Sequence, residues 1–335
     1  MPRFRRVRRR AHTSLAAIAL LFVTHCGESG PGPTPPTPLP LSITCPARVN
    51  AQSSDGSPVP VTLSQPQTTG GRAPVNVSCS APPSTFPVGS TTINCTANDT
   101  AGQNASCSYI VAVQGPPKLK FTRFLSFGDS LTAGVISQGP TFLLVVAPDS
   151  YPARLEGMLR LRYRFQGASP VVLNEGLPAE FTTDGLRRLR GVLQQHRPEV
   201  LLLMEGTNDL LDRPDTLRGA NTAIANLKLM IAEAKALNVQ VALATVPPQR
   251  SGGLRHRDAV AATVPGFNDR IRELAAAEKV VLVDVYNGMK DDLSLIGLDD
   301  LHPTVFGYEV MAKIYQEAIE KGFEEPPPSV TRMPW

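Results

Sequence analysis

Short apolar runs alternate with helix-like stretches from residue 121 to about residue 323. Five runs are apolar almost throughout, as expected of strands buried on both faces of a sheet; they are residues 124–128, 171–174, 200–204, 239–244 and 280–284. Between them, apolar residues recur at helical spacing, as Ile224, Leu227 and Ile231 do. Five strands separated by helices predict an α/β fold, a three-layer α/β/α sandwich around a five-stranded parallel sheet.

Residues 41–114 follow another pattern, with short alternating runs such as 75–79 and 91–96 in a segment rich in Thr, Ser, Val, Pro and Asn. Regular short strands separated by turn residues predict a small all-β sandwich. A chain of 335 residues is long enough for two domains. We therefore expect a β-sandwich at 41–114, a linker at 115–120, an α/β domain at 121–323 and a Pro-rich tail at 324–335.

Four of the five cysteines lie in the predicted β-sandwich: Cys45, Cys79, Cys95 and Cys107. Four cysteines in a small exported domain are most simply two disulfides, for which three pairings exist. Metal binding is the alternative, but the region contains no Cys-x-x-Cys and no histidine. We expect Cys79–Cys95 and Cys45–Cys107.

The N-terminus has the pattern of an export signal. An Arg-rich start is followed by the apolar residues 15–23, too short to span a bilayer as a permanent helix. Cys26 then stands where a bacterial lipobox has its lipidated cysteine, although His25 replaces the usual small residue. We expect a signal peptide with lipobox at 1–26, a Pro-rich tether at 27–40, and a membrane-anchored lipoprotein. A plain secretory leader and a periplasmic or secreted protein are the alternative.

The basic charge belongs to this leader. Six arginines lie in the first ten residues, and without them the formal net charge falls from +4 to −2. The remainder of the chain is therefore not expected to bind nucleic acid.

Polar residues follow several of the predicted strands. Ser130 follows the first strand on a Gly-Asp-Ser turn, and three further groups follow later in the chain: 174–176, 205–209 and 298–304. Parallel strands end at one edge of their sheet, where ligands bind in this class of fold. A serine on a strand-to-helix turn is also typical of hydrolytic α/β folds, although an Asx turn without chemistry has the same appearance.

A hydrolytic serine needs a base, a group that orients the base, and donors for the oxyanion. His302 is the best candidate base, because His196 ends a basic helix and His256 lies in a charged run, whereas only His302 has an acid three residues before it. Asp299 is the expected partner, and Asp300 is the competitor.

Residues 121–322 resemble the SGNH/GDSL hydrolases. The resemblance lies in four blocks in the family's order: 127–134 (FGDSLTAG), 174–176 (NEG), 206–209 (GTND) and 299–303 (DDLHP). It implies a flavodoxin-like fold with Ser130 as nucleophile, His302 as base and Asp299 as its partner. It also implies an oxyanion hole made of the Ser130 N–H, the Gly176 N–H and the Asn208 amide. Many relatives have a further glycine where Ala179 stands, which affects the expected loop shape.

Residues 41–114 resemble the hyalin-repeat (HYR) type of immunoglobulin-like module. The resemblance rests on Cys45-Pro46, on residues 85–92 and 95–99, and on residues 105–109. Such modules imply an extracellular spacer or adhesion domain, and a possible contact with a surface or a carbohydrate.

The sequence therefore predicts an exported serine esterase that acts through an acyl-enzyme and needs no metal or other cofactor. Its partner is an ester substrate: a lipid ester, a short acyl ester or an acetylated carbohydrate. A surface-binding lipoprotein with a non-catalytic hydrolase-like domain is the alternative. The segment Val135–Ser150 contains the apolar residues 142–146, which line an acyl pocket or pack on the sheet; packing on the sheet is the expectation.

Overall fold

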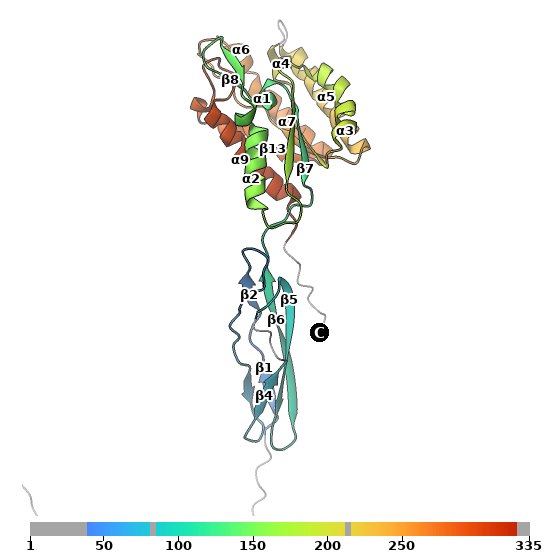
Figure 1. Cartoon of the computed structure of the whole chain (residues 1–335), viewed down its shortest axis with the longest axis vertical. Helices are drawn as coiled ribbons and strands as arrows, with labels where there is room; N and C mark the ends of the chain where they lie inside the picture. Colours follow the sequence, from blue (N-terminus) through green and yellow to red (C-terminus); the bar gives the residue numbers. More distant parts are fainter. Residues whose placement is uncertain (1–38, 81–84, 212–215, 327–335) are drawn as a thin grey trace, which may run out of the picture.

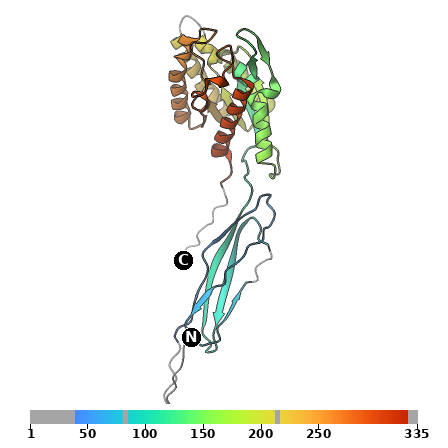
Figure 2. The same ribbon diagram turned by 90° about the vertical axis from the view of Figure 1, so that its left-hand side faces the viewer.

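The structure is a computed structural model that describes residues 39–80, 85–211 and 216–326. The predicted signal peptide, Cys26 and most of the two Pro-rich segments lie outside the described residues. The described part consists of a β-rich module and an α/β domain, arranged end to end in an elongated molecule (Figures 1 and 2). None of the helices in this part is long and apolar enough to cross a bilayer.

The α/β domain is built on a five-stranded parallel sheet, as predicted. Its strands lie in the order β10 (Val171–Gly176), β7 (Arg123–Gly128), β11 (Val200–Met204), β12 (Gln240–Ala244) and β13 (Val281–Val283). In register, Gly128 pairs with Gly176 on one side and with Met204 on the other. Three strands therefore end level with one another, just before the segments that carry the candidate residues.

Helices cover both faces of the sheet (Figure 1). Helices α2 (Tyr151–Arg162) and α9 (Val305–Phe323) pack together on one face, where the rings of Tyr151 and Tyr315 stack 4.4 Å apart. Helices α3 (Thr182–His196), α5 (Thr216–Ala236) and α7 (Val264–Glu278) cover the other face. Each helix buries one stripe, because its apolar residues recur every three to four positions. The shorter helices are α1 (Ser130–Ala133), α4 (Thr207–Leu211), α6 (Asp258–Ala261) and α8 (Val285–Met289), with 3-10 turns at Ala147–Asp149 and Leu293–Leu295.

The segment after α1 is a β-hairpin, formed by β8 (Val135–Ser137) and β9 (Leu143–Val145). The expectation that residues 142–146 pack on the sheet is wrong for 142–145, although Val146 packs against the core of the α/β domain. Their exposed fractions are 57% for Phe142, 45% for Leu143, 38% for Leu144 and 58% for Val145. The hairpin satisfies its backbone hydrogen bonds by pairing with itself, so it is not bound to the sheet as a further strand.

The β-rich module contains a four-stranded sheet in the order β2 (Val49–Gln52), β6 (Asn104–Gln114), β5 (Gly89–Asn98) and β4 (Asn76–Cys79), and a separate pair of β1 (Ser42–Thr44) and β3 (Gln67–Thr69). Alternate residues of β5 and β6 face a small core that includes Ile93 and Val111. The disulfides are Cys45–Cys107 and Cys79–Cys95, the expected pairing.

The module is attached at the amino edge of the parallel sheet. The linker leads into β7, and its Lys120 N–H donates to the carbonyl of Phe323 at the end of α9. The Glu325 N–H in turn donates to the carbonyl of Lys118. The β-rich module and the end of α9 therefore meet at the edge opposite to the carboxyl ends of the strands (Figures 1 and 2).

Candidate active site

Ser130 lies on a tight turn between β7 and α1. The Oδ1 atom of Asp129 caps α1 by accepting the Leu131 N–H at 2.9 Å. Gly128 allows the close approach of β7 and β11, because a Cβ atom there would lie 2.2 Å from the Met204 carbonyl oxygen. The side chain of Ser130 thus reaches the carboxyl edge of the sheet, and its N–H makes no hydrogen bond within the described residues.

His302 and Asp299 complete a hydrogen-bonded chain with this serine. The Nε2 atom of His302 lies 2.9 Å from Ser130 Oγ, and its Nδ1 atom lies 2.6 Å from Asp299 Oδ2. An ionised carboxylate can only accept, so Nδ1 carries the proton and Nε2 accepts from the Ser130 hydroxyl. All three residues are buried. The three candidates therefore lie together, although 172 positions separate Ser130 and His302 in the sequence.

Burial by itself would raise the pKa of Asp299. The hydrogen bond and the attraction from His302, with the backbone N–H groups of His302 and Leu301, outweigh burial and lower this pKa below its ordinary value. Asp299 thus stays ionised beside the imidazole at neutral pH, which is the state needed to orient the histidine and to stabilise its cation.

The competitor, Asp300, has other partners. Its Oδ2 atom accepts the Arg255 N–H at 2.6 Å, and its backbone carbonyl accepts the Arg250 N–H. Asp300 therefore holds the loop after β12. His196 pairs with Glu175 at 2.8 Å, and His256 is exposed, so neither of the other two histidines of this domain joins the Ser130 chain.

Gly176 lies against α1, as a candidate oxyanion donor should. A Cβ atom at this position would lie 2.1 Å from the Ala133 nitrogen, so only glycine fits. Its N–H, however, donates to Asn174 Oδ1 at 2.9 Å, and the Asn174 amide donates to the Thr132 carbonyl. The Gly176 N–H is therefore occupied in this arrangement. Ala179 has a φ of 64°, so it adopts the left-handed conformation that glycine adopts most readily.

Asn208 is held at the start of α4. Its Nδ2 donates to the Glu180 carbonyl at 2.8 Å, which leaves the second N–H of the amide for another acceptor. The next residue, Asp209, accepts from the Thr182 hydroxyl at 2.6 Å and from the Thr182 N–H at 3.0 Å. These bonds join the segment after β11 to the segment after β10.

A buried charged cluster beneath the edge was not predicted. Its centre is the ion pair between Arg188 of α3 and the buried Glu180, with Nη2 and Oε2 2.6 Å apart. Arg188 also donates to the Glu175 carbonyl at 2.8 Å, and its guanidinium lies 3.8 Å from the centre of the Phe127 ring. The sequence signal for this cluster is Glu205, a carboxyl that directly follows five buried apolar residues.

Two carboxyls of this region have pKa values above their ordinary range. Burial, with repulsion from Asp129, raises the pKa of Glu205 well above its usual range. Burial also raises the pKa of Asp129 to about 7, although the Leu131 N–H and His302 oppose this rise. Neither Glu205 oxygen makes a hydrogen bond of good geometry within the described residues, but the neighbouring Glu180 carboxyl also raises the pKa of Glu205.

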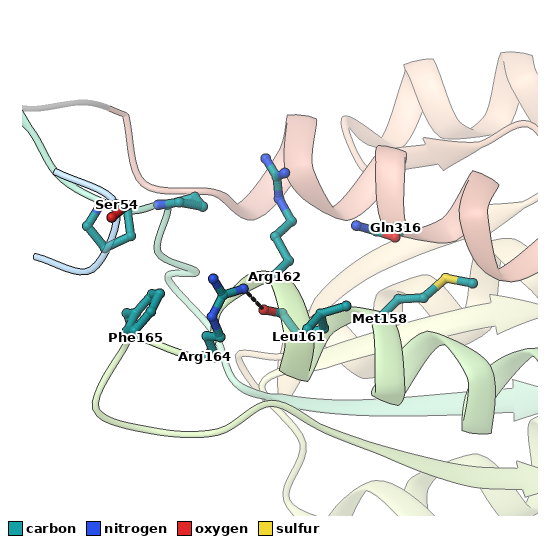
Figure 3. Close-up of a pocket in the computed structure, with 9 residues that line it drawn as sticks. Ser54, Met158, Leu161, Arg162, Arg164, Phe165 and Gln316 are labelled. Carbon is teal, nitrogen blue, oxygen red and sulfur yellow. Dashed lines mark hydrogen bonds between the residues drawn. The ribbon is translucent and has the colours of Figure 1, made fainter. Parts of the chain in front are cut away.

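A cavity of about 420 Å³ lies elsewhere, at the junction of the two domains (Figure 3). Residues from the module, the linker, α2 and α9 line it, among them Ser54, Pro117, Arg162 and Phe165. It lies at the amino edge of the sheet, so the cavity and the Ser130 edge are at opposite ends of the α/β domain.

Two family models match the chain. The family model for the GDSL-like lipase/acylhydrolase family matches residues 126–310, and that for the HYR domain matches residues 35–113. No curated protein matches the chain.

Among solved structures, a lipase/acylhydrolase from Enterococcus faecalis is 25% identical with a TM-score of 0.50; the match covers 62% of this chain and 98% of that one. An aryl esterase from M. smegmatis is 22% identical with a TM-score of 0.50; the match covers 60% of this chain and 99% of that one. The first model spans more than half of the chain, and the chain therefore belongs to the GDSL-like lipase/acylhydrolase family, with a HYR domain before its hydrolase domain.

Proposed function

We propose that this protein is an exported serine ester hydrolase. Ser130 Oγ attacks the ester carbonyl carbon while His302 Nε2 takes the hydroxyl proton, and Asp299 stabilises the imidazolium that forms. The tetrahedral intermediate collapses, and His302 gives the proton to the departing alcohol. Water then attacks the acyl-enzyme with the same proton transfers, which releases the carboxylic acid and restores Ser130.

The developing oxyanion needs donors. We propose three hydrogen-bond donors for it. Two of them have an N–H that is not used elsewhere in the described residues: the Ser130 backbone N–H and the second N–H of the Asn208 amide. The third, the Gly176 N–H, becomes available only if its hydrogen bond to Asn174 opens. Loss of one donor typically costs about 3 kcal/mol of transition-state stabilisation.

The observation that carries this proposal is the hydrogen-bonded chain from Ser130 through His302 to Asp299. Its test is covalent labelling with a fluorophosphonate together with hydrolysis of p-nitrophenyl acetate. Ser130→Ala should lose both, whereas Ser294→Ala, which changes an exposed serine, should keep both. Equal labelling of wild type and Ser130→Ala, or no labelling of either, contradicts the mechanism and leaves the non-catalytic surface lipoprotein.

The two disulfides support export, because such bonds persist in oxidising compartments. We propose that Cys26 carries the lipid anchor and that the HYR domain is a spacer able to contact a surface or a carbohydrate. Cys26→Ser should move the protein from the membrane fraction to the soluble fraction. A wild-type protein that is already fully soluble contradicts the anchor and leaves a periplasmic or secreted enzyme.

A further inference from the structure

Exposed apolar side chains gather at the carboxyl edge of the parallel sheet. The large apolar side chains exposed in the described residues include four on the β8–β9 hairpin, one directly after β10 and three that lie near Asp299 and His302 in the sequence. We define the apolar collar as residues 142–145 of the β8–β9 hairpin with Leu177, Leu298 and Phe306. Isolated exposed apolar residues are ordinary, but a group of them around one site marks a binding surface.

Each part of the collar is connected to a segment that carries a residue of the proposed triad, either by a hydrogen bond or through the chain. The hairpin begins one residue after α1, and its Ser137 hydroxyl oxygen accepts the Asp299 N–H at 3.0 Å. The Leu177 N–H donates to the Gly128 carbonyl at 2.8 Å. Leu298 adjoins Asp299, and Phe306 follows His302 by four residues. Figure 1 shows β8 beside α1, at the end of the hydrolase domain that lies away from the module.

The chemistry of the collar selects one kind of occupant. No charged residue occurs from Val135 to Val146, and the collar side chains are aliphatic or phenyl groups without a hydrogen-bonding atom. An acetyl group has only one methyl carbon beyond the carbonyl carbon that Ser130 attacks. It is too short to cover the collar, which would stay exposed to water. An acyl chain of several methylenes can lie across it, with each buried methylene contributing to binding.

We infer that the apolar collar binds the acyl chain of the ester substrate, so that the enzyme prefers medium- and long-chain esters to acetyl esters. This inference rests on the proposed ester hydrolysis, because the collar is defined by its attachment to the segments that carry Ser130, Asp299 and His302. It goes beyond that proposal by naming the acyl part of the substrate and the surface that recognises it.

The first test is a chain-length series on the full chain: p-nitrophenyl acetate, butyrate and octanoate. The variants are Phe142→Thr with Leu144→Thr, and Leu143→Thr with Val145→Thr, since threonine keeps a high β-propensity. The matched control is Leu229→Ser, which changes an exposed leucine on α5. Wild type and control should gain at least about tenfold in kcat/KM from acetate to octanoate. One or both hairpin variants should lose most of that gain and keep the acetate rate, which also shows that they are folded.

The second test does not depend on turnover. Ser130→Ala protein is titrated calorimetrically with 2-decanone, an uncharged ketone that cannot be hydrolysed, and with acetone. The collar is supported if 2-decanone binds, acetone does not, and the hairpin variants bind 2-decanone more weakly. If this holds but no ester is turned over, only the proposed hydrolysis fails. Ester turnover without chain-length preference and without 2-decanone binding overturns the collar and leaves the esterase standing. A concentration-dependent dimer that is lost in the hairpin variants also overturns it, because the occupant would then be a second copy.

Discussion

Asp299 and Asp300 are neighbours in the chain, yet the fold gives them different partners. Asp299 contacts His302, while Asp300 accepts the Arg255 N–H. Asp299→Asn should therefore lower kcat by roughly 10³- to 10⁴-fold, because the amide no longer favours the tautomer that accepts the serine proton. Asp300→Asn should keep most activity, since asparagine tolerates the φ of 68° at this position and can still accept from Arg255. Steady-state kinetics with p-nitrophenyl acetate decides; the reverse pattern would move the partner by one residue.

Asp129 should make the hydrolase domain less stable as the pH rises. Its pKa is about 7 in the folded protein against an ordinary value of 3.8, so the folded state holds a proton that the unfolded state has released. The free energy of unfolding should therefore fall between about pH 4 and pH 7, by an amount on the order of a few kcal/mol. Asp129→Asn can keep the acceptor for the Leu131 N–H without the titrating group.

Denaturant unfolding of wild type and Asp129→Asn at pH 4, 5.5 and 7.5 measures this effect. Relative to wild type, the variant should become more stable with each step upward in pH. Carboxyls that do not interact with Asp129 contribute equally in both proteins and cancel. Glu205 does not cancel, because Asp129 raises its pKa, and its contribution changes the difference in the same direction. A stability difference that stays constant across this range contradicts the assignment to Asp129.

The placement of Ser130, Asp299 and His302 together could be predicted, because each lies in a short local pattern at the end of a strand or beside a helix. The occupied Gly176 N–H could not, since it depends on how the Asn174 side chain turns back onto the strand end. The Glu180–Arg188 pair could not either, because it joins a loop and a helix whose charges look like ordinary surface residues in the sequence.

At the scale of elements, Arg188 links α3 to the ends of two strands. It donates to the Glu175 carbonyl at the end of β10 and lies over Phe127 of β7, while it neutralises Glu180. Arg188→Met should lower the free energy of unfolding by roughly 3 kcal/mol, because it leaves Glu180 buried without its partner. Adding Glu180→Gln should restore much of the loss. Urea unfolding of both single variants and the double variant gives the coupling, and additive effects would contradict a dependent pair.

The five strands of the parallel sheet and the layer architecture could be predicted from the apolar runs in the sequence. The β8–β9 hairpin could not. Residues 142–146 look like a core segment because apolar runs usually are buried. Residues 142–145 are exposed because β9 pairs with β8. This pairing joins two segments, so the pattern within one segment does not predict it. The same limit applies to strand order, since β7 lies between β10 and β11 although it comes first of the three in the chain.

At the scale of the molecule, the HYR domain and the triad lie at opposite edges of the hydrolase domain. The module has its own small core and two disulfides, and in the described residues its core shares no member with the hydrolase core. This arrangement places the carboxyl edge on the side of the hydrolase domain that faces away from the HYR domain (Figures 1 and 2). A spacer role agrees with such a position, because the module contributes distance and no residue of the triad.

Deletion of residues 41–114 should therefore leave ester hydrolysis intact. The shortened chain keeps Lys118 and Lys120, whose backbone groups bond to the end of α9, and so keeps the amino edge of the sheet closed. Its kcat/KM for p-nitrophenyl acetate should equal that of the full chain, and its hydrolase core should melt at a similar temperature. A full-length protein with Cys79→Ser and Cys95→Ser, which weakens the module by the roughly 2–4 kcal/mol that a disulfide contributes, serves as the matched control and should be equally active. Loss of activity in the deletion variant at an unchanged melting temperature would show that the module acts on the catalytic edge from the opposite end of the domain, and the spacer role would then be wrong.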